Sequence, residues 1–448
     1  MNRLAWISIA VLVLATGGFL GYKALRPKKP QPWYEKPRIG DEVLDQVLLF
    51  YLGESWSGMT DIGEILETVD RISVKDPRSW SREFRATADR VEAAAQATER
   101  AGHELSAGEL SLRAASYYRA ALHRHMDPYA PEVAEMAAKE VAAFTRAMTL
   151  LGLPVERVEI PFENTGLFAY WYHLPGRERR PVIIGHEGRD GWAEDMYYIG
   201  REALRRGYDC LLLDGPGQGS TLRLRNLPFR PDWEKVITPA IDWLASKPEV
   251  DPEAIGLMGL SMGGALAPRA AEHEPRIAFL VANPGVTNWS GTFFRTLNEI
   301  SPMIARLSVS NPRALDALMG TAGKLSPFLQ WGMSDSMWKH GVRTPSALLA
   351  EMRRYDASAE IGRIACPTLV VDAEAEPYGD AKEFYKALKC PKTYVLFTRA
   401  EGAPMHVQTA ALAIGSQKVF DWIDDTVATL REKKNGDITR PSSHFPFI

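Results

Sequence analysis

The sequence predicts an α/β fold in which a doubly wound, mostly parallel sheet is preceded by a helical cap segment and interrupted by a helical lid insertion. From residue 181 onward, short runs rich in valine, isoleucine and leucine alternate with stretches of helical periodicity. These runs are apolar almost throughout, which is typical of parallel strands that helices cover on both faces. With 448 residues, 46% of them hydrophobic, the chain is long and apolar enough for a large core of this kind.

The first 25 residues differ from the rest of the chain. An uncharged run of 19 residues extends from Leu4 to Tyr22. As a helix it would span about 28 Å, close to the hydrocarbon core of a bilayer. One arginine precedes the run and a basic cluster follows it, so we expect residues 1–25 to be a single-pass membrane anchor with the bulk of the chain in the cytoplasm. The alternative is a signal peptide, whose cleavage would lead to export.

The next two segments are predicted to be a linker and a helical cap domain. Residues 26–40 are basic and rich in proline, as in an extended linker. From 41 to 152, apolar residues recur at three- and four-residue spacing in long, alanine-rich stretches. This helical segment is also a candidate surface for a homodimer.

Residues 153–431 are predicted to form the α/β core, and residues 432–448 a tail. The stretches "VERVEIPF" and "LFAYWYHLP" alternate like antiparallel strands, and six apolar runs follow them. The interval 288–363, between the fourth and fifth of these runs, is too long for a simple crossover helix. We predict that it is a helical lid over the functional site.

The hexapeptide "GLSMGG" at 259–264 lies where an apolar run meets a helical stretch. Gly259, Ser261 and Gly263 match the G-x-S-x-G nucleophile elbow, a turn too tight for side chains two residues on either side of the serine. A strand before the motif and a helix after it are the context that this motif requires. Ser261 is therefore the predicted nucleophile, and the N–H of Met262 is a predicted oxyanion donor. The alternative is a glycine-rich loop with an incidental serine.

A serine nucleophile needs a base that accepts its proton, and behind such an elbow the acid and then the histidine follow in the chain. Four histidines follow Ser261: His273, His340, His406 and His444. His406 comes after the last apolar run and before the last helical stretch, where the base is expected. His273 lies in the helical stretch just after the elbow, His340 in the predicted lid and His444 in the tail. His406 is therefore the predicted base.

The acid is expected on the loop after the run "CPTLVV". Four carboxylates are candidates: Asp372, Glu374, Glu376 and Asp380. Asp372 falls at the end of the predicted strand, and Asp380 suits a helix N-cap. Glu376 is preferred because it stands far enough along the loop to reach the histidine and fix its tautomer. Glu374 is the second candidate.

A second oxyanion donor is expected in the loop "GHEGRDGWAED". There Gly188 or the adjacent Glu187 could offer a backbone N–H. The segment "DGPGQG" (214–219) follows the next apolar run. It has neither the G-x-G-x-x-G pattern nor a Walker lysine, so we interpret it as a tight structural turn.

The composition argues against several other classes of protein. A net charge of −3 gives no basic field for nucleic acid, so no nucleic-acid partner is expected. The three cysteines are far apart, and neither they nor the histidines have metal-ligand spacing. We expect neither a metal nor a cofactor.

These motifs together resemble a branch of the α/β-hydrolases that includes 2,6-dihydroxypseudooxynicotine hydrolase and fungal hydrolases that shorten polyketide pigment precursors. The segments "DGPGQG", "GLSMGG", "CPTLVVDAEAE", "KCPKTYVLF" and "EGAPMH" carry the resemblance, which spans about residues 41–430. It implies a triad of Ser261, Glu376 and His406 and oxyanion contacts at Gly188 and Met262. Two departures stand out: relatives often have aspartate as the acid, and Glu187-Gly188 replaces a common Gly-Gly.

The resemblance implies hydrolysis of an ester or of a carbon–carbon bond next to a ketone. The tryptophans and tyrosines of the helical segments favour an apolar or aromatic small molecule as the substrate; the alternative is that these side chains only fill the core. The alternative function is a membrane-tethered, non-catalytic scaffold or binding protein that has kept the fold.

Overall fold

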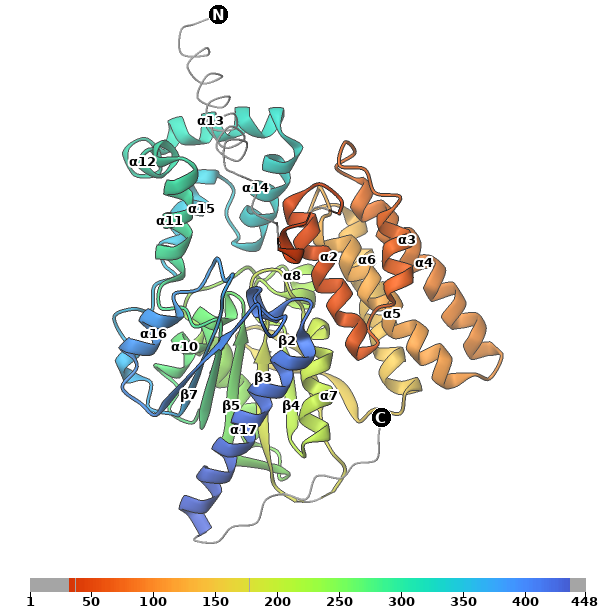
Figure 1. Ribbon diagram of the computed structural model, residues 1–448, viewed down its shortest axis with the longest axis vertical. Helices are drawn as coiled ribbons and strands as arrows, with labels where there is room; N and C mark the ends of the chain where they lie inside the picture. The colour runs from red at the N-terminus through yellow and green to blue at the C-terminus, as the bar shows by residue number, and fades with distance from the viewer. Residues whose placement is uncertain (1–31, 37, 177, 436–448) are drawn as a thin grey trace, which may run out of the picture.

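The computed structural model describes residues 32–36, 38–176 and 178–435. At its centre lies an eight-stranded sheet with the strand order β1-β2-β4-β3-β5-β6-β7-β8 (Figure 1). β1 (Val155–Phe162) and β2 (Thr165–Tyr172) are antiparallel to each other, and β2 is antiparallel to β4. All other neighbours are parallel, among the strands β3 (Arg180–His186), β4 (Asp209–Leu213), β5 (Val250–Leu260), β6 (Phe279–Asn283), β7 (Thr368–Ala373) and β8 (Lys392–Phe397). The predicted mostly parallel sheet is confirmed.

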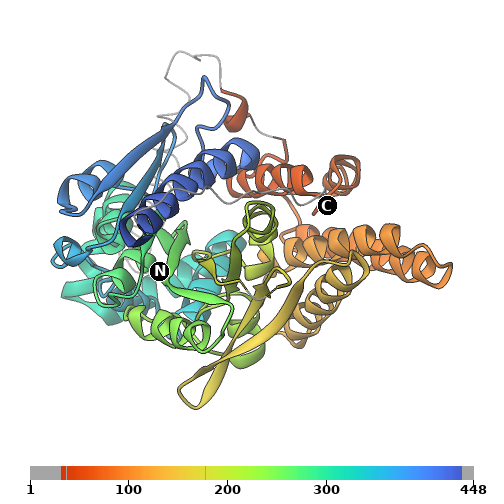
Figure 2. The same cartoon turned by 90° about the horizontal axis from the view of Figure 1, so that it is seen from below.

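Helices cover both faces of the sheet and create two cores. In β5, Met258 and Leu260 enter the first core and Leu257 the second, because successive side chains of a strand point to opposite faces. The helices of the first face are α7 (Tyr197–Arg205) and α17 (Leu412–Asn435), and those of the second are α9 (Glu234–Ala245), α10 (Gly263–Ala271) and α16 (Ala381–Ala387). Figure 2 views the sheet from the ends of its strands, with α17 on one side and α9 on the other.

Before the sheet, the chain is helical. The elements are η1 (Trp33–Glu35), α2 (Glu42–Glu54), η2 (Ser55–Ser57), α3 (Ile62–Val69), α4 (Ser79–Arg100), α5 (Glu104–His123) and α6 (Pro131–Leu150). The apolar faces of α2 to α6 belong to the first core, so the cap helices and one face of the sheet share a single hydrophobic cluster. The domain limits 41–152 stay a prediction.

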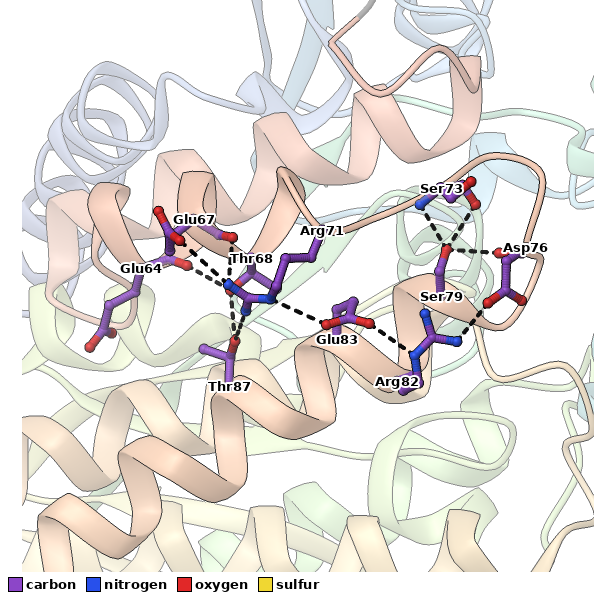
Figure 3. A network of polar contacts seen from close by, with 10 residues as sticks. All are labelled: Glu64, Glu67, Thr68, Arg71, Ser73, Asp76, Ser79, Arg82, Glu83 and Thr87. Carbon is purple, nitrogen blue, oxygen red and sulfur yellow. Dashed lines mark hydrogen bonds and ion pairs between the residues drawn. The ribbon is translucent and has the colours of Figure 1, made fainter.

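A network of polar side chains links the C-terminal end of α3 to α4 (Figure 3). Arg71 donates to the Glu67 carbonyl at 2.7 Å and to the Thr87 hydroxyl at 3.2 Å, and it pairs with Glu83 at 3.2 Å. The hydroxyls of Thr68 and Thr87 lie 2.7 Å apart between the two helices. The network therefore joins the end of α3 to the first turns of α4.

The interval between β6 and β7 is helical, as expected of the predicted lid. It contains α11 (Trp289–Ile300), α12 (Pro302–Ser310), α13 (Pro312–Leu325), α14 (Pro327–Lys339), α15 (Pro345–Met352) and the short turn η4 (Ile361–Arg363). α12 to α15 each begin with proline at the first turn, where the missing N–H has no intrahelical partner in any case. In Figure 1 these helices lie beyond the carboxyl ends of the parallel strands.

The structure corrects the predicted membrane localisation. Within residues 32–36, 38–176 and 178–435, no helix is long and apolar enough to cross a bilayer, so a single-pass membrane protein is not supported. The segment 1–25, on which the prediction rested, lies outside the described residues, as do residues 26–31 and 37 of the predicted linker and the tail from 436. The homodimer through the cap helices stays a prediction.

Candidate active site

Ser261 stands on a sharp turn between the end of β5 and the start of α10. Its φ of +59° is left-handed, which is a strained conformation for a residue with a side chain. The first glycine of the pattern is sterically required, because a Cβ on Gly259 would lie 2.0 Å from the Gly263 carbonyl oxygen. A Cβ on Gly263 would lie 3.0 Å from the Glu187 carbonyl oxygen, and one on the next residue, Gly264, would lie 1.9 Å from the Pro284 oxygen. The Ser261 N–H donates to the Asn283 carbonyl at 2.7 Å. The turn therefore has the geometry that the G-x-S-x-G pattern predicts.

Ser261, His406 and Glu376 meet at the carboxyl end of the sheet. His406 opens the short turn η5 (His406–Gln408) after β8, and its Nε2 lies 2.9 Å from Ser261 Oγ. Its Nδ1 lies 2.8 Å from both carboxylate oxygens of Glu376, whose side chain is only 3% exposed. The N–H of Tyr378 also donates to Glu376 Oε1 at 2.9 Å, which fixes the carboxylate. The three predicted residues thus form a hydrogen-bonded relay.

The other candidate acids point elsewhere. Glu374 accepts the backbone N–H of Arg399 at 2.6 Å, and Asp372 accepts the hydroxyl of Tyr394 at 2.6 Å. Asp380 stands at the N-cap position of α16, but its carboxylate accepts the N–H of Thr287 instead of a helix N–H.

The remaining histidines are also apart from the serine. His273 follows α10 and lies 3.2 Å from Glu360, and His340 packs on the ring of Phe229. His444 lies outside the described residues. Of the described histidines, His406 alone contacts Ser261 by a hydrogen bond.

The predicted oxyanion residues lie side by side. A Cβ on Gly188 would be 2.6 Å from both Met262 N and Ser261 Cβ, so the Gly188 backbone abuts the nucleophile turn. Met262 is the N-cap of α10, where the first N–H groups have no intrahelical acceptor. The N–H of Gly188 donates to Glu187 Oε2 at 3.2 Å. Gly188 is therefore in place, but in this structure its N–H is engaged by the neighbouring carboxyl group.

Glu187 is a buried acid beside this turn. Burial raises its pKa to about 8, and the nearby Asp195 adds to the effect. The adjacent His186 is held neutral because burial lowers its pKa to about 4. His186 Nδ1 lies 3.1 Å from the Glu187 carbonyl, and its Nε2 lies 3.2 Å from the indole N–H of Trp233. The loop thus contains a neutral histidine and a carboxyl group with a high pKa.

The segment "DGPGQG" is hydrogen-bonded to the loop that carries Glu187 and Gly188. The Gln218 side chain donates to the carbonyls of Glu187 and Gly188, the latter at 3.0 Å, and accepts the Gly215 N–H at 2.9 Å. The sequence predicts only a tight turn here, and the role of Gln218 was not predicted. A polar side chain inside an otherwise glycine-rich turn was the available signal.

Helices of the predicted lid and of the predicted cap contact the loops around Ser261. Asp335 and Lys339 of α14 form ion pairs with Arg189 and Asp190 of the loop after β3, at 2.5 to 2.9 Å. Burial alone would raise the pKa of the Asp190 carboxyl group, but the charges of Arg189 and Lys339 lower it below its usual value.

From the cap, Gly53 of α2 packs on the segment after His406. A Cβ on Gly53 would lie 2.9 Å from Ala410 Cα. Neither the lid contact nor the cap contact was predictable from residue spacing.

One group of side chains among the described residues could hold a cation: Glu272, His273 and Glu360. It lies at the C-terminal end of α10, whereas Ser261 lies just before the helix begins. Since α10 is nine residues long, the two sites are about 13 Å or more apart, and the group takes no part in the triad.

Residues 171–413 match the sequence model of the alpha/beta hydrolase family, and the chain belongs to this family. It is an enzyme of the hydrolase class, so a non-catalytic scaffold is not supported.

Two fungal proteins are similar over most of their length. The hydrolyase poxO of Penicillium oxalicum is 31% identical over 408 residues, covering 84% of this chain and 94% of poxO. The 20-hydroxy-prefusarin hydrolase FUS2 of Gibberella moniliformis is 29% identical over 399 residues, covering 83% and 93%.

Among solved structures, 2,6-dihydroxy-pseudo-oxynicotine hydrolase has the same fold. The TM-score is 0.65 at 19% identity, with 88% of this chain and 99% of that chain covered. The predicted resemblance to this branch of the α/β-hydrolases is confirmed.

Proposed function

We propose that this enzyme hydrolyses an ester, or a carbon–carbon bond next to a ketone, in an apolar or aromatic small molecule through Ser261, His406 and Glu376. The observation that carries the proposal is the relay of hydrogen bonds, 2.9 Å from Ser261 Oγ to His406 Nε2 and 2.8 Å from His406 Nδ1 to Glu376. This arrangement is the one in which a neutral imidazole removes the serine proton.

The reaction then follows from the positions of these groups. His406 Nε2 takes the proton as Ser261 Oγ attacks the carbonyl carbon, and Glu376 stabilises the imidazolium that forms. Backbone N–H groups near Gly188 and Met262 are the donors for the developing oxyanion. The C–O bond of the ester, or the C–C bond next to the ketone, then breaks and leaves the acyl group on Ser261 Oγ. His406 returns the proton to the departing alkoxide or enolate. A water molecule, activated in the same way, releases the carboxylic acid from Ser261.

The surroundings of the relay favour an apolar or aromatic substrate. The Tyr378 ring lies 5.0 Å from the His406 ring, and Trp289 of α11 lies 6.2 Å from Tyr378, centroid to centroid. Aromatic side chains of this kind offer a large apolar contact surface. The names of the relatives, a hydrolase of 20-hydroxy-prefusarin and one of 2,6-dihydroxy-pseudo-oxynicotine, agree with a small-molecule substrate.

A fluorophosphonate probe tests the nucleophile. We expect it to label Ser261, and we expect Ser261→Ala to abolish labelling and to lower turnover by up to about a millionfold. Ser246→Ala is the matched control, since this exposed serine only donates to the Trp243 carbonyl. Wild-type turnover in a folded Ser261→Ala variant would exclude the proposed mechanism.

A second assay separates the two bond types. Short p-nitrophenyl esters report ester hydrolysis, and an aryl 1,3-diketone reports carbon–carbon cleavage by release of a carboxylic acid and a ketone. Turnover of either substrate that depends on Ser261 supports the proposal and assigns the bond. Turnover that is independent of Ser261 contradicts it.

A further inference from the structure

The segment that follows His406 has an unusual backbone. Val407, Gln408 and Ala410 have φ values of +46°, +55° and +64°, in the left-handed region that side chains disfavour. A left-handed conformation is unfavourable for each such residue, because the Cβ comes too close to the carbonyl oxygen. It persists only where the surrounding structure fixes it. Contacts around this segment must therefore hold it, and with it the imidazole.

One such contact is a buried pair of side-chain amides. Asn283 Nδ2 donates to Gln408 Oε1 at 2.8 Å, and Gln408 Nε2 faces Asn283 Oδ1 at 3.4 Å. The two residues are 5% and 2% exposed, so water does not compete for these groups. They are far apart in the chain, and the pair joins the end of β6 to the turn η5.

Asn283 also contacts the nucleophile turn. Its backbone carbonyl accepts the N–H of Ser261 at 2.7 Å, so one residue is bonded both to Ser261 and to the segment of His406. Gln408 itself lies two residues after His406, and the intervening hydrogen bonds are local. The amide pair therefore connects the turn that carries Ser261 to the segment that carries His406.

We propose that Asn283 and Gln408 are positioning residues that hold the imidazole of His406 on the hydroxyl of Ser261. The proposal rests on the proposed triad and adds to it two residues that do not touch the reacting atoms. A purely structural pair would contribute only to the stability of the fold, as buried hydrogen bonds do. A positioning pair also sets the rate of the chemical step, since a displacement of about 1 Å costs on the order of 100-fold.

The test exchanges the lengths of the two side chains. Gln408→Asn shortens one partner and Asn283→Gln lengthens the other, so each single variant disrupts the pair, whereas the double variant restores the combined length. We expect each single variant to lower kcat and the rate of fluorophosphonate labelling by about 10- to 100-fold, with KM changed less than threefold. The double variant is expected to recover most of the loss.

Two further variants keep the result interpretable. Gln408→Met has nearly the shape of glutamine without its hydrogen bonds, so it tests the pair even if Asn283→Gln does not fold. Gln96→Asn is the matched control, because Gln96 is an exposed residue of α4 that bonds only to Glu92 on its own helix. Folding is checked by circular dichroism and thermal melting.

The proposal is overturned if folded Gln408→Asn and Gln408→Met proteins keep the wild-type kcat. It is also overturned if the double variant is no faster than the slower single variant. Ser261→Ala is run in parallel: if it still abolishes labelling, the triad stands and only the positioning role fails. Retained labelling in Ser261→Ala would instead refute the proposed function itself.

Discussion

The most informative single change is Glu376→Gln, because it removes one charge and almost no volume. Both carboxylate oxygens lie 2.8 Å from His406 Nδ1, and the side chain is 3% exposed, so water cannot take over the role of the lost charge. The Tyr378 N–H requires an acceptor at the Oε1 position. The amide NH₂ group of glutamine is then placed at the Oε2 position, where it faces the Nδ1–H of the histidine.

The imidazole then keeps a single acceptor, the amide oxygen that it shares with the Tyr378 N–H, while the NH₂ group faces the Nδ1–H from the Oε2 position and weakens the orientation of the ring. The imidazolium of the transition state also loses its counter-charge. We expect kcat to fall by about 10⁴-fold, the loss known for such an amide replacement in a serine triad. This corresponds to about 5.5 kcal/mol of transition-state stabilisation. Fluorophosphonate labelling and ester turnover measure the effect, and thermal melting verifies the fold.

Glu374→Gln is the matched control, since it makes the same chemical change two residues earlier in the same loop. Glu374 accepts the Arg399 N–H and does not contact the imidazole. We expect less than a threefold change in kcat. The opposite ranking of the two variants would refute the assignment of Glu376 as the acid and transfer that role to Glu374.

Three other changes test the surroundings of the site. Gly53→Ala puts a Cβ 2.9 Å from Ala410 Cα and displaces the segment of His406, so we expect kcat to fall about tenfold or more. Gly332→Ala in α14 is the control: its Cβ would have no atom within 4 Å, and we expect kcat to stay unchanged. Arg119→Leu leaves the buried carboxylates of Asp195 and Glu140 without their partner, and urea titration is expected to show a loss of about 3–5 kcal/mol in the free energy of unfolding. Glu187→Gln tests the raised pKa of about 8 of the Glu187 carboxyl group. In the folded wild type this carboxyl group keeps its proton up to about pH 8, whereas in the unfolded chain it releases the proton above about pH 4.3. The free energy of unfolding of the wild type therefore falls as the pH rises toward 8. Melting curves at pH 5.5 and 8 are expected to show a smaller loss in Glu187→Gln than in the wild type, and equal losses would refute the raised pKa.

The sequence carries enough information for the sheet and for the order of the triad. Parallel strands buried on both faces leave continuous apolar runs in the sequence. The turn at Ser261 needs glycine at positions 259 and 264, because a Cβ at either position would clash with a backbone oxygen. The choice between Glu374 and Glu376 was harder because both stand on one irregular loop. Only the conformation of that loop decides which carboxylate faces His406.

Single polar residues that support the site have no comparable signal. Gln218, Asn283 and Gln408 each lie in a different segment, and their role depends on partners that are distant in the chain. Spacing rules describe one helix or one strand, so they do not reveal contacts between segments. The same limit applies to the membrane prediction, which used only the composition of a segment outside the described residues, and which the described helices do not support.

The helices α2 to α6 pack directly on the sheet and contact the loops around Ser261. Their apolar faces share one hydrophobic cluster with the sheet, and Arg119 of α5 crosses the same boundary to bond Asp195 Oδ1 at 2.6 Å, beside the loop of Glu187. Since Arg119 is fully buried, separating the cap from the sheet would expose this ion pair and the shared core together. Gly53 adds a contact to the histidine segment from the same helical layer. The cap therefore restricts both loops that flank Ser261, the one that carries Gly188 and the one that carries His406.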